Sequence, residues 1–97
     1  MHLAKYDKLV EEIYEEIMDS QNYAKCAMKY KADDRPLSET YHSLAKQEWG
    51  HAQTLMEHAG RVAMMDETIK IMWERDHERM MNWMSDVKMR LEQLHEM

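Results

Sequence analysis

Apolar side chains recur every three or four residues along three long segments of the chain. With about 100° of rotation per residue, this spacing aligns them as a stripe along one side of an α-helix. The three stripes are, in chain order, Tyr6, Leu9, Val10, Ile13, Ile17, Ser20, Ala24 and Ala27; Tyr41, Leu44, Ala45, Ala52, Leu55, Ala59 and Val62; and Ile69, Trp73, Met80, Met84, Val87 and Leu91. Because each stripe persists along its whole segment, the sequence predicts an all-α fold of three long helices.

A short polar segment, residues 32–36, separates the first two stripes. We expect the first helix to extend over about residues 3–31 and to end at this segment. Pro36 disrupts a helix interior but fits a first turn, so the second helix should begin close to it. Asp33 or Asp34 is then the expected N-cap, because a carboxylate can accept a hydrogen bond from a free backbone N–H of the first turn.

The second break is shorter than the first. The second helix is expected to reach about Ala63, although Gly60 offers an earlier end. Asp66 is a candidate N-cap for a third helix that extends from Glu67 to near the C-terminus. Connections this short join antiparallel neighbours, so the first two helices should form a hairpin with the third helix beside it.

The composition supports this architecture. Glycine occurs twice and proline once among the 97 residues, which favours few, long elements. Phe is absent and Val, Ile and Thr are few, which argues against a sheet. The length fits a single domain, residues 1–97, whose core would be thin in a monomer and would be thickened by association.

Charge and cysteine content exclude several classes of function. The 13 Lys and Arg are interspersed among 19 Asp and Glu, for a net charge of −6, so nucleic-acid binding is not expected. No apolar run approaches the roughly 20 residues needed to cross a bilayer, and residues 1–5 lack the apolar core of a signal peptide. Cys26 is the only cysteine, which rules out an internal disulfide. We therefore expect a cytoplasmic protein.

One carboxylate lies where the pattern calls for an apolar side chain. Glu48 falls in the middle of the second stripe, seven residues from both Tyr41 and Leu55. A buried, unpaired carboxylate is costly, so a partner must compensate its charge. His51, one turn later, forms a Glu-x-x-His unit with it, and side chains at this spacing can reach one ion. Glu48 and His51 are therefore candidate metal ligands.

The other two helices offer further candidates. Glu16 lies about 60° from the centre of the first stripe, and Tyr23 follows two turns later on the same edge. Asp19, about 120° from the centre, is the weaker candidate for the ligand from this helix. His77 falls within the third stripe and is a candidate additional ligand. The alternatives are a surface residue for Glu16 and a hydrogen-bonded core histidine for His77.

The 12 methionines require a separate interpretation, since several lie in or just before the third segment. Thioethers are soft ligands that can hold Cu(I). Methionine also fills irregular helical cores and adaptable interfaces, and packing is the interpretation that we favour from the sequence.

Glu16, Tyr23 and the unit Glu48-Trp49-Gly50-His51 resemble a pattern of the ferritin-like superfamily, which includes ferritins and rubrerythrins. In that pattern a Glu on one helix is followed two turns later by a Tyr, and the next helix carries Glu-x-x-His. The sequences of residues 19–24 and 44–52 also resemble rubrerythrin helices. The resemblance covers roughly residues 9–60.

The resemblance implies a di-iron centre, with Mn or Zn as alternative metals, that oxidises Fe(II) with dioxygen or removes peroxide. Carboxylates bridge and neutralise two irons in such a centre, and histidines complete the coordination. Glu48 would bridge, Glu16 and His51 would be terminal ligands, and Tyr23 and Asp19 would stand beside them.

A full ferritin-like site takes its ligands from two helix pairs, whereas this chain has one clear pair and a third helix. Two chains related by a two-fold axis would complete a four-helix ferritin-like bundle, as in the encapsulated ferritins that this chain resembles in size and half-site. Compact ferritin-like chains of bacteria and phages look similar. We therefore expect a homodimer or larger assembly, with a protein partner as a further option.

The rival hypothesis is a helical module for protein interaction or self-assembly that binds no metal and has no catalytic role. A phage-type accessory protein that kept the fold and lost the chemistry would belong to this class. The methionine-rich third helix suits such a role, because flexible thioether side chains adapt to a partner.

Overall fold

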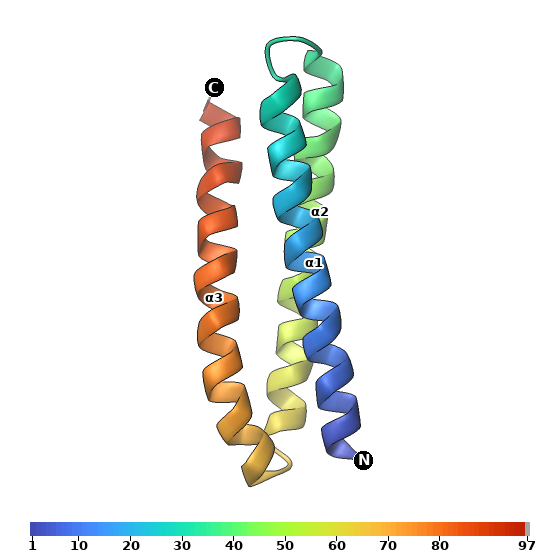
Figure 1. Ribbon diagram of the computed structural model, residues 1–97, viewed down its shortest axis with the longest axis vertical. Coiled ribbons are helices and arrows are strands. Elements are labelled where there is room, and N and C mark those ends of the chain that lie inside the picture. The colour runs from blue at the N-terminus through green and yellow to red at the C-terminus, as the bar shows by residue number, and fades with distance from the viewer. Residues whose placement is uncertain (97) are drawn as a thin grey trace.

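The computed structural model describes the backbone of residues 1–96 and the side chains of residues 1–94. Over this range the chain forms three α-helices, α1 (His2–Tyr30), α2 (Arg35–Ala63) and α3 (Glu67–Glu96), and no strand (Figure 1). The predicted all-α fold of three long helices is confirmed. Helices α1 and α2 are antiparallel, and α3 runs in the direction of α1. The three helices lie side by side along their length, and the molecule is a rod of 50 × 19 × 14 Å.

Both breaks between helices lie where the sequence placed them. The carboxylate of Asp34, rather than that of Asp33, caps α2 by accepting a hydrogen bond from the Leu37 N–H at 3.1 Å. At the second break, Asp66 Oδ1 accepts a hydrogen bond from the Thr68 N–H at 2.8 Å, and α3 follows. Both caps satisfy N–H groups that have no partner within the first turn of a helix.

Gly60 does not end α2, which continues to Ala63. Its role is to make room for α3, because a Cβ atom at Gly60 would lie 3.4 Å from Nε1 of the Trp73 indole. The indole therefore packs directly on the backbone of α2. A glycine that looks like a stop signal in the sequence is here a site of close approach.

Helices α1 and α2 pack closely through small side chains. Ser20 Oγ donates a hydrogen bond to the backbone oxygen of Ala45 at 2.7 Å, and Ser38 Oγ donates to that of Ala27 at 2.6 Å. The fully buried alanines of this seam are Ala24, Ala27, Ala45, Ala52 and Ala59. Because methyl and hydroxymethyl groups occupy little space, the two backbones approach one another, and we call this pair the α1–α2 hairpin.

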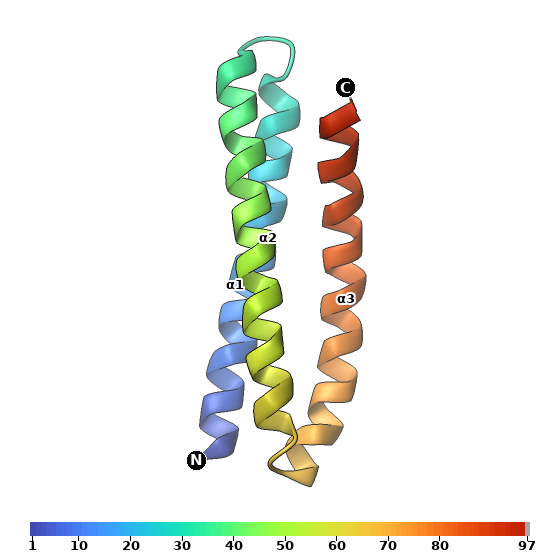
Figure 2. The same cartoon turned by 180° about the vertical axis from the view of Figure 1, so that it is seen from behind.

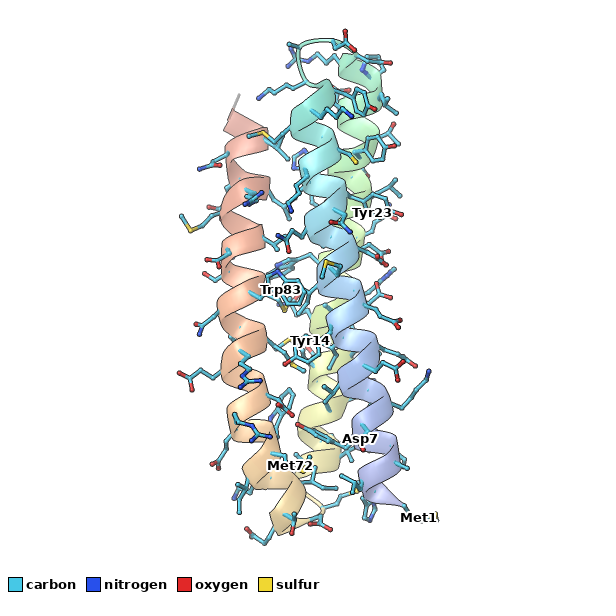
Figure 3. The ribbon with its side chains drawn as sticks, viewed as in Figure 1. Met1, Asp7, Tyr14, Tyr23, Met72 and Trp83 are labelled. Atoms are coloured by element: carbon cyan, nitrogen blue, oxygen red, sulfur yellow. The ribbon has the colours of Figure 1, made fainter. Side chains whose placement is uncertain are left out.

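Helix α3 stands farther from the hairpin, as both views show (Figures 1 and 2). Large side chains fill the intervening space, with Trp83 and Tyr14 between α3 and α1 (Figure 3), their ring centroids 6.1 Å apart. Trp83 Nε1 donates to Gln21 Oε1 at 2.7 Å, and Trp49 Nε1 donates to the backbone oxygen of Met84 at 3.0 Å. These aromatic residues bury apolar area and find partners for their N–H groups.

A third polar contact fixes the end of α3 next to the second break. Tyr6, which is fully buried, donates its hydroxyl hydrogen to Asp76 Oδ2 at 2.6 Å and packs edge-on against Trp73. Burial is the largest cause that raises the pKa of Tyr6, followed by the hydrogen bond to Asp76. Tyr6 therefore remains a neutral donor, and it ties the start of α1 to α3.

The core follows the three predicted stripes with some shifts. Every stripe residue is at least partly buried, although Leu9, Val10, Tyr41, Leu44, Leu55 and Trp73 keep contact with solvent. The structure also buries residues outside the stripes, namely Ser38, Met56, Ala63 and Leu94. Over the described residues, none of the helices combines the length and the apolar character that crossing a bilayer requires.

Candidate metal site

Three of the predicted ligands come together between α1 and α2. Glu16 of α1 and Glu48 and His51 of α2 each offer one ligand atom, and these atoms lie within 4.8 Å of one another. His51 Nδ1 is 3.4 Å from Glu48 Oε1 and 3.5 Å from Glu16 Oε2. Within the described part of the chain, no other group of three or more His, Cys, Asp or Glu side chains has ligand atoms close enough together to share one metal ion.

The register of the hairpin brings the two carboxylates level. The hydrogen bond from Ser20 to Ala45 fixes one point of that register. In the antiparallel pair, Glu16 lies four residues before Ser20, and Glu48 lies three residues after Ala45. Each carboxylate thus lies about one helical turn from the Ser20–Ala45 contact, in the same direction along the hairpin. The two carboxylates therefore face each other across the seam.

The three candidate ligands differ in how far their side chains are buried. The side chains of Glu48 and Glu16 are 21% and 26% exposed, whereas that of His51 is 61% exposed. The expectation that Glu48 lies at the centre of a buried stripe is therefore only partly right. Helix α2 packs against two neighbours, so Ala45, Ala52 and Met56 define its centre, and Glu48 lies on the flank.

The site opens on the side of the hairpin away from α3. On α1, Tyr14 packs against α3, and Glu16 lies about 160° of rotation away from it. On α2, Trp49 bonds to α3, and His51 again lies about 160° away. An ion held by these residues would consequently have coordination positions open to the outside of the hairpin.

The electrostatics of the site favour a cation. The pKa of Glu16 is raised from its ordinary value of 4.5 to about 7. The largest cause is the Glu48 carboxylate, which can accept a hydrogen bond from Glu16 once Glu16 is protonated; burial and repulsion from the Glu48 charge follow, and His51 opposes the shift. Glu16 Oε2 is shielded from solvent and accepts no hydrogen bond. Two carboxylates at this distance need either a proton or a positive ion between them.

The donor set defines which ions would fit. Two carboxylates and one imidazole suit Fe(II), Mn(II) or Zn(II), whereas soft ions prefer sulfur. Three protein ligands from one side of a hairpin are sufficient to bind a single ion and leave room for water or further ligands.

Neither Tyr23 nor Asp19 belongs to the group of candidate ligands. The ring of Tyr23 stacks on that of Tyr41 at 6.0 Å, and Tyr41 also stacks on Tyr30 at 6.0 Å. Tyr23 is thus part of a tyrosine stack across the hairpin. Asp19 is exposed, and its negative charge contributes to the raised pKa of Glu16.

His77 is not brought to this group within the chain. It is an exposed residue of α3, and its ring centroid lies 4.8 Å from that of Trp73. It borders a groove between α2 and α3 instead. Because His77 lies on α3 and Glu16 points away from α3, the two residues lie on different sides of the molecule.

The contacts that position these three side chains are not evident from the sequence pattern. The hydrogen bond from Ser20 to Ala45 is one such contact, and in the sequence Ser20 is only one member of the first apolar stripe. A serine among buried alanines is a usable signal, since a buried hydroxyl needs an acceptor and the backbone of a close neighbour can provide one.

Compared with protein-family models, with curated proteins and with solved structures, the chain gives no match to any of them.

Proposed function

We propose that this protein binds a divalent transition metal through Glu16, Glu48 and His51, and that it acts as a ferritin-like protein. The observation that carries the proposal is the convergence of three ligand atoms within 4.8 Å at a point where Glu16 has a shielded oxygen without a hydrogen-bond partner. A cation there would replace the shared proton and compensate both carboxylates.

The second part of the proposal is that two copies join their sites. On α1, Leu9 and Tyr23 lie seven residues on either side of Glu16, and Tyr41 and Leu55 flank Glu48 on α2 in the same way. At seven-residue spacing each row drifts by only about 20° per step, so each carboxylate sits within a partly buried apolar row. We call these two rows the open face.

A two-fold contact between open faces would pair two hairpins as a four-helix bundle and leave α3 on the outside. Such a contact is isologous, so each copy would supply the same three ligands. Two ions would then share four carboxylates and two imidazoles. Iron is the metal we favour: bound as Fe(II), it would supply the electrons that reduce dioxygen or peroxide, and Glu16, Glu48 and His51 of each copy would hold it.

Metal binding is tested with Glu48→Ala, with Glu15→Ala as the control because Glu15 is an exposed acid beside Glu16. Fe(II), Mn(II) or Zn(II) should raise the melting temperature of the wild type and of the control, since the ion binds only the folded protein. Glu48→Ala should lose this response, keep its helix content and be at least as stable without metal. Melting curves of the wild type that do not move with any of the three ions would refute the proposal.

The second candidate function is a helical interaction or self-assembly module without metal. It is favoured by large apolar side chains that are exposed on α1 and α3, among them Met18, Met28, Ile71 and Met89. In that case Glu48→Ala should lower stability, because Glu48 would then be held by protein contacts alone, and the oligomeric state should not respond to metal.

A further inference from the structure

The methionine-rich third helix and His77 have no part in the site described above, yet the structure brings them to one place. A groove of about 480 Å³ lies between α2 and α3. Three methionines and one histidine line it: Met56 from α2, and His77, Met81 and Met84 from α3. The three α3 residues follow one another at spacings of four and three, which places them on one side of the helix.

These four side chains differ chemically from those of the carboxylate site. Thioether sulfur is a soft, neutral ligand, and imidazole accepts soft and borderline metals, so the set selects Cu(I) over Fe(II) or Mn(II). Met56 and Met84 are buried, whereas Met81 and His77 are exposed. Two sulfurs are thus shielded from water, and the other two ligands lie at the groove opening, where an ion would enter.

The charges around the groove favour an ion of low charge. Lys88 borders the groove, and its Nζ lies 5.8 Å from the ring centroid of Trp49. The acidic member of the lining is Glu57, which is exposed. Lys88 and Glu57 carry opposite charges, so the lining is formally neutral. A monovalent ion on neutral ligands needs less compensation there than a divalent ion would.

We propose that this groove binds one Cu(I) ion through the sulfurs of Met56, Met81 and Met84 and the imidazole of His77. The site is separate from Glu16, Glu48 and His51, takes a different class of metal and does not depend on a second copy. Packing alone accounts for buried Met56 and Met84. Met81 and His77 line the same groove as these two methionines and would add the third and fourth ligands of the ion.

The first experiment measures Cu(I) affinity without oxygen, by competition with a coloured Cu(I) chelator. Met81→Leu is compared with Met65→Leu, since Met81 and Met65 are 49% and 51% exposed and only Met81 lines the groove. We expect the wild type to bind one equivalent, and Met81→Leu and His77→Gln to weaken binding by about tenfold or more. Met65→Leu should match the wild type. Equal affinities of Met81→Leu and Met65→Leu would overturn the proposal.

Cys26 is the other soft ligand of the chain, so Cys26→Ser is tested in parallel. Retained Cu(I) binding in this variant supports the groove, and its loss would assign the ion to the thiol. The second experiment adds Ag(I), a diamagnetic substitute for Cu(I), to protein labelled at the methionine methyl groups. The resonances of Met56, Met81 and Met84 should shift while that of Met65 stays in place. Shifts spread evenly over all methionines would contradict the assignment.

Discussion

Ser20 Oγ donates a hydrogen bond to the backbone oxygen of Ala45 at 2.7 Å, and this contact holds α1 and α2 in the register that aligns their carboxylates. Ser20→Ala should lower the free energy of unfolding by about 1 kcal/mol, because one buried hydrogen bond is lost and no space is filled. Metal-induced stabilisation should persist, since alanine preserves the close approach.

Ser20→Leu is the informative partner of that variant. A larger side chain in the seam must push the helices apart, at a cost of about 1–3 kcal/mol. The distance between Glu16 and Glu48 would then increase, and metal affinity should fall along with stability. Chemical denaturation of both variants with and without metal provides the comparison. Metal affinity that is insensitive to Ser20→Leu would show that the close approach of α1 and α2 does not control the site.

The raised pKa of Glu16 predicts a pH dependence of the metal-free protein. Below about pH 4.5, Glu16 is protonated in both the folded and the unfolded chain; between 4.5 and about 7 only the folded chain keeps the proton. Because the unfolded state then binds fewer protons, the contribution of Glu16 to stability is present at low pH and is lost as pH rises to about 7.

The measurement is the stability difference between the wild type and Glu16→Gln from pH 4 to pH 8, which cancels the contributions of the other acids. Relative to Glu16→Gln, the wild type should become less stable over this window. In the presence of metal the trend should reverse, because the ion competes with the proton and binds better as the proton leaves. A difference that stays constant with pH would place the pKa of Glu16 near its ordinary value.

The proposed two-fold contact predicts that the open face controls the oligomeric state. Leu55→Glu places a charge seven residues after Glu48, in the same row, and should convert a dimer to a monomer, because an unpaired charge is costly in an interface. Ile71→Glu is the control, since Ile71 is an exposed apolar residue of α3.

Light scattering at micromolar concentration, with circular dichroism as the test of folding, distinguishes the outcomes. Dimers of the wild type and of Ile71→Glu, with a folded monomer for Leu55→Glu, would support the arrangement. A monomeric wild type both with and without metal would remove the second copy from the proposal and leave a mononuclear site.

Tyr6 and Asp76 provide a test of how α3 is attached. Tyr6→Phe keeps the ring and removes the donor, so Asp76, whose side chain is 14% exposed, loses this hydrogen bond and keeps, among the described residues, only the ion pair with Arg75. The expected loss of stability is about 1–3 kcal/mol. Metal affinity should not change, because the hairpin holds all three ligands. Lost metal binding in folded Tyr6→Phe protein would mean that α3 takes part in shaping the site.

The sequence predicted the helices almost to their ends, because strong periodicity and the polar breaks around Pro36 and Asp66 determine them. It left the cap of α2 open between Asp33 and Asp34, and the structure assigns it to Asp34.

Of the four residues expected to bind metal, Glu16, Glu48 and His51 lie together in the structure and His77 does not. A carboxylate in an apolar stripe is a conspicuous signal, which is why the sequence pattern singled out Glu48. The sequence pattern wrongly placed His77 within the buried third stripe, whereas the structure exposes His77 at the groove between α2 and α3. A stripe indicates the buried side of a helix on average and does not say which neighbour covers each position. The pattern overestimated the burial of Glu48 for the same reason, as α2 divides its buried surface between two neighbours.

The small residues of the α1–α2 seam also set the limits within which this chain can evolve. Glu16 stands on one side of that seam, and Glu48 and His51 stand on the other, so any enlargement of Ala45 or Ala52 would alter the spacing of the ligands. The contacts of α3 are made by large, adaptable side chains that tolerate substitution more readily. We therefore expect natural variation to accumulate in α3 and to be strongly restricted along the seam.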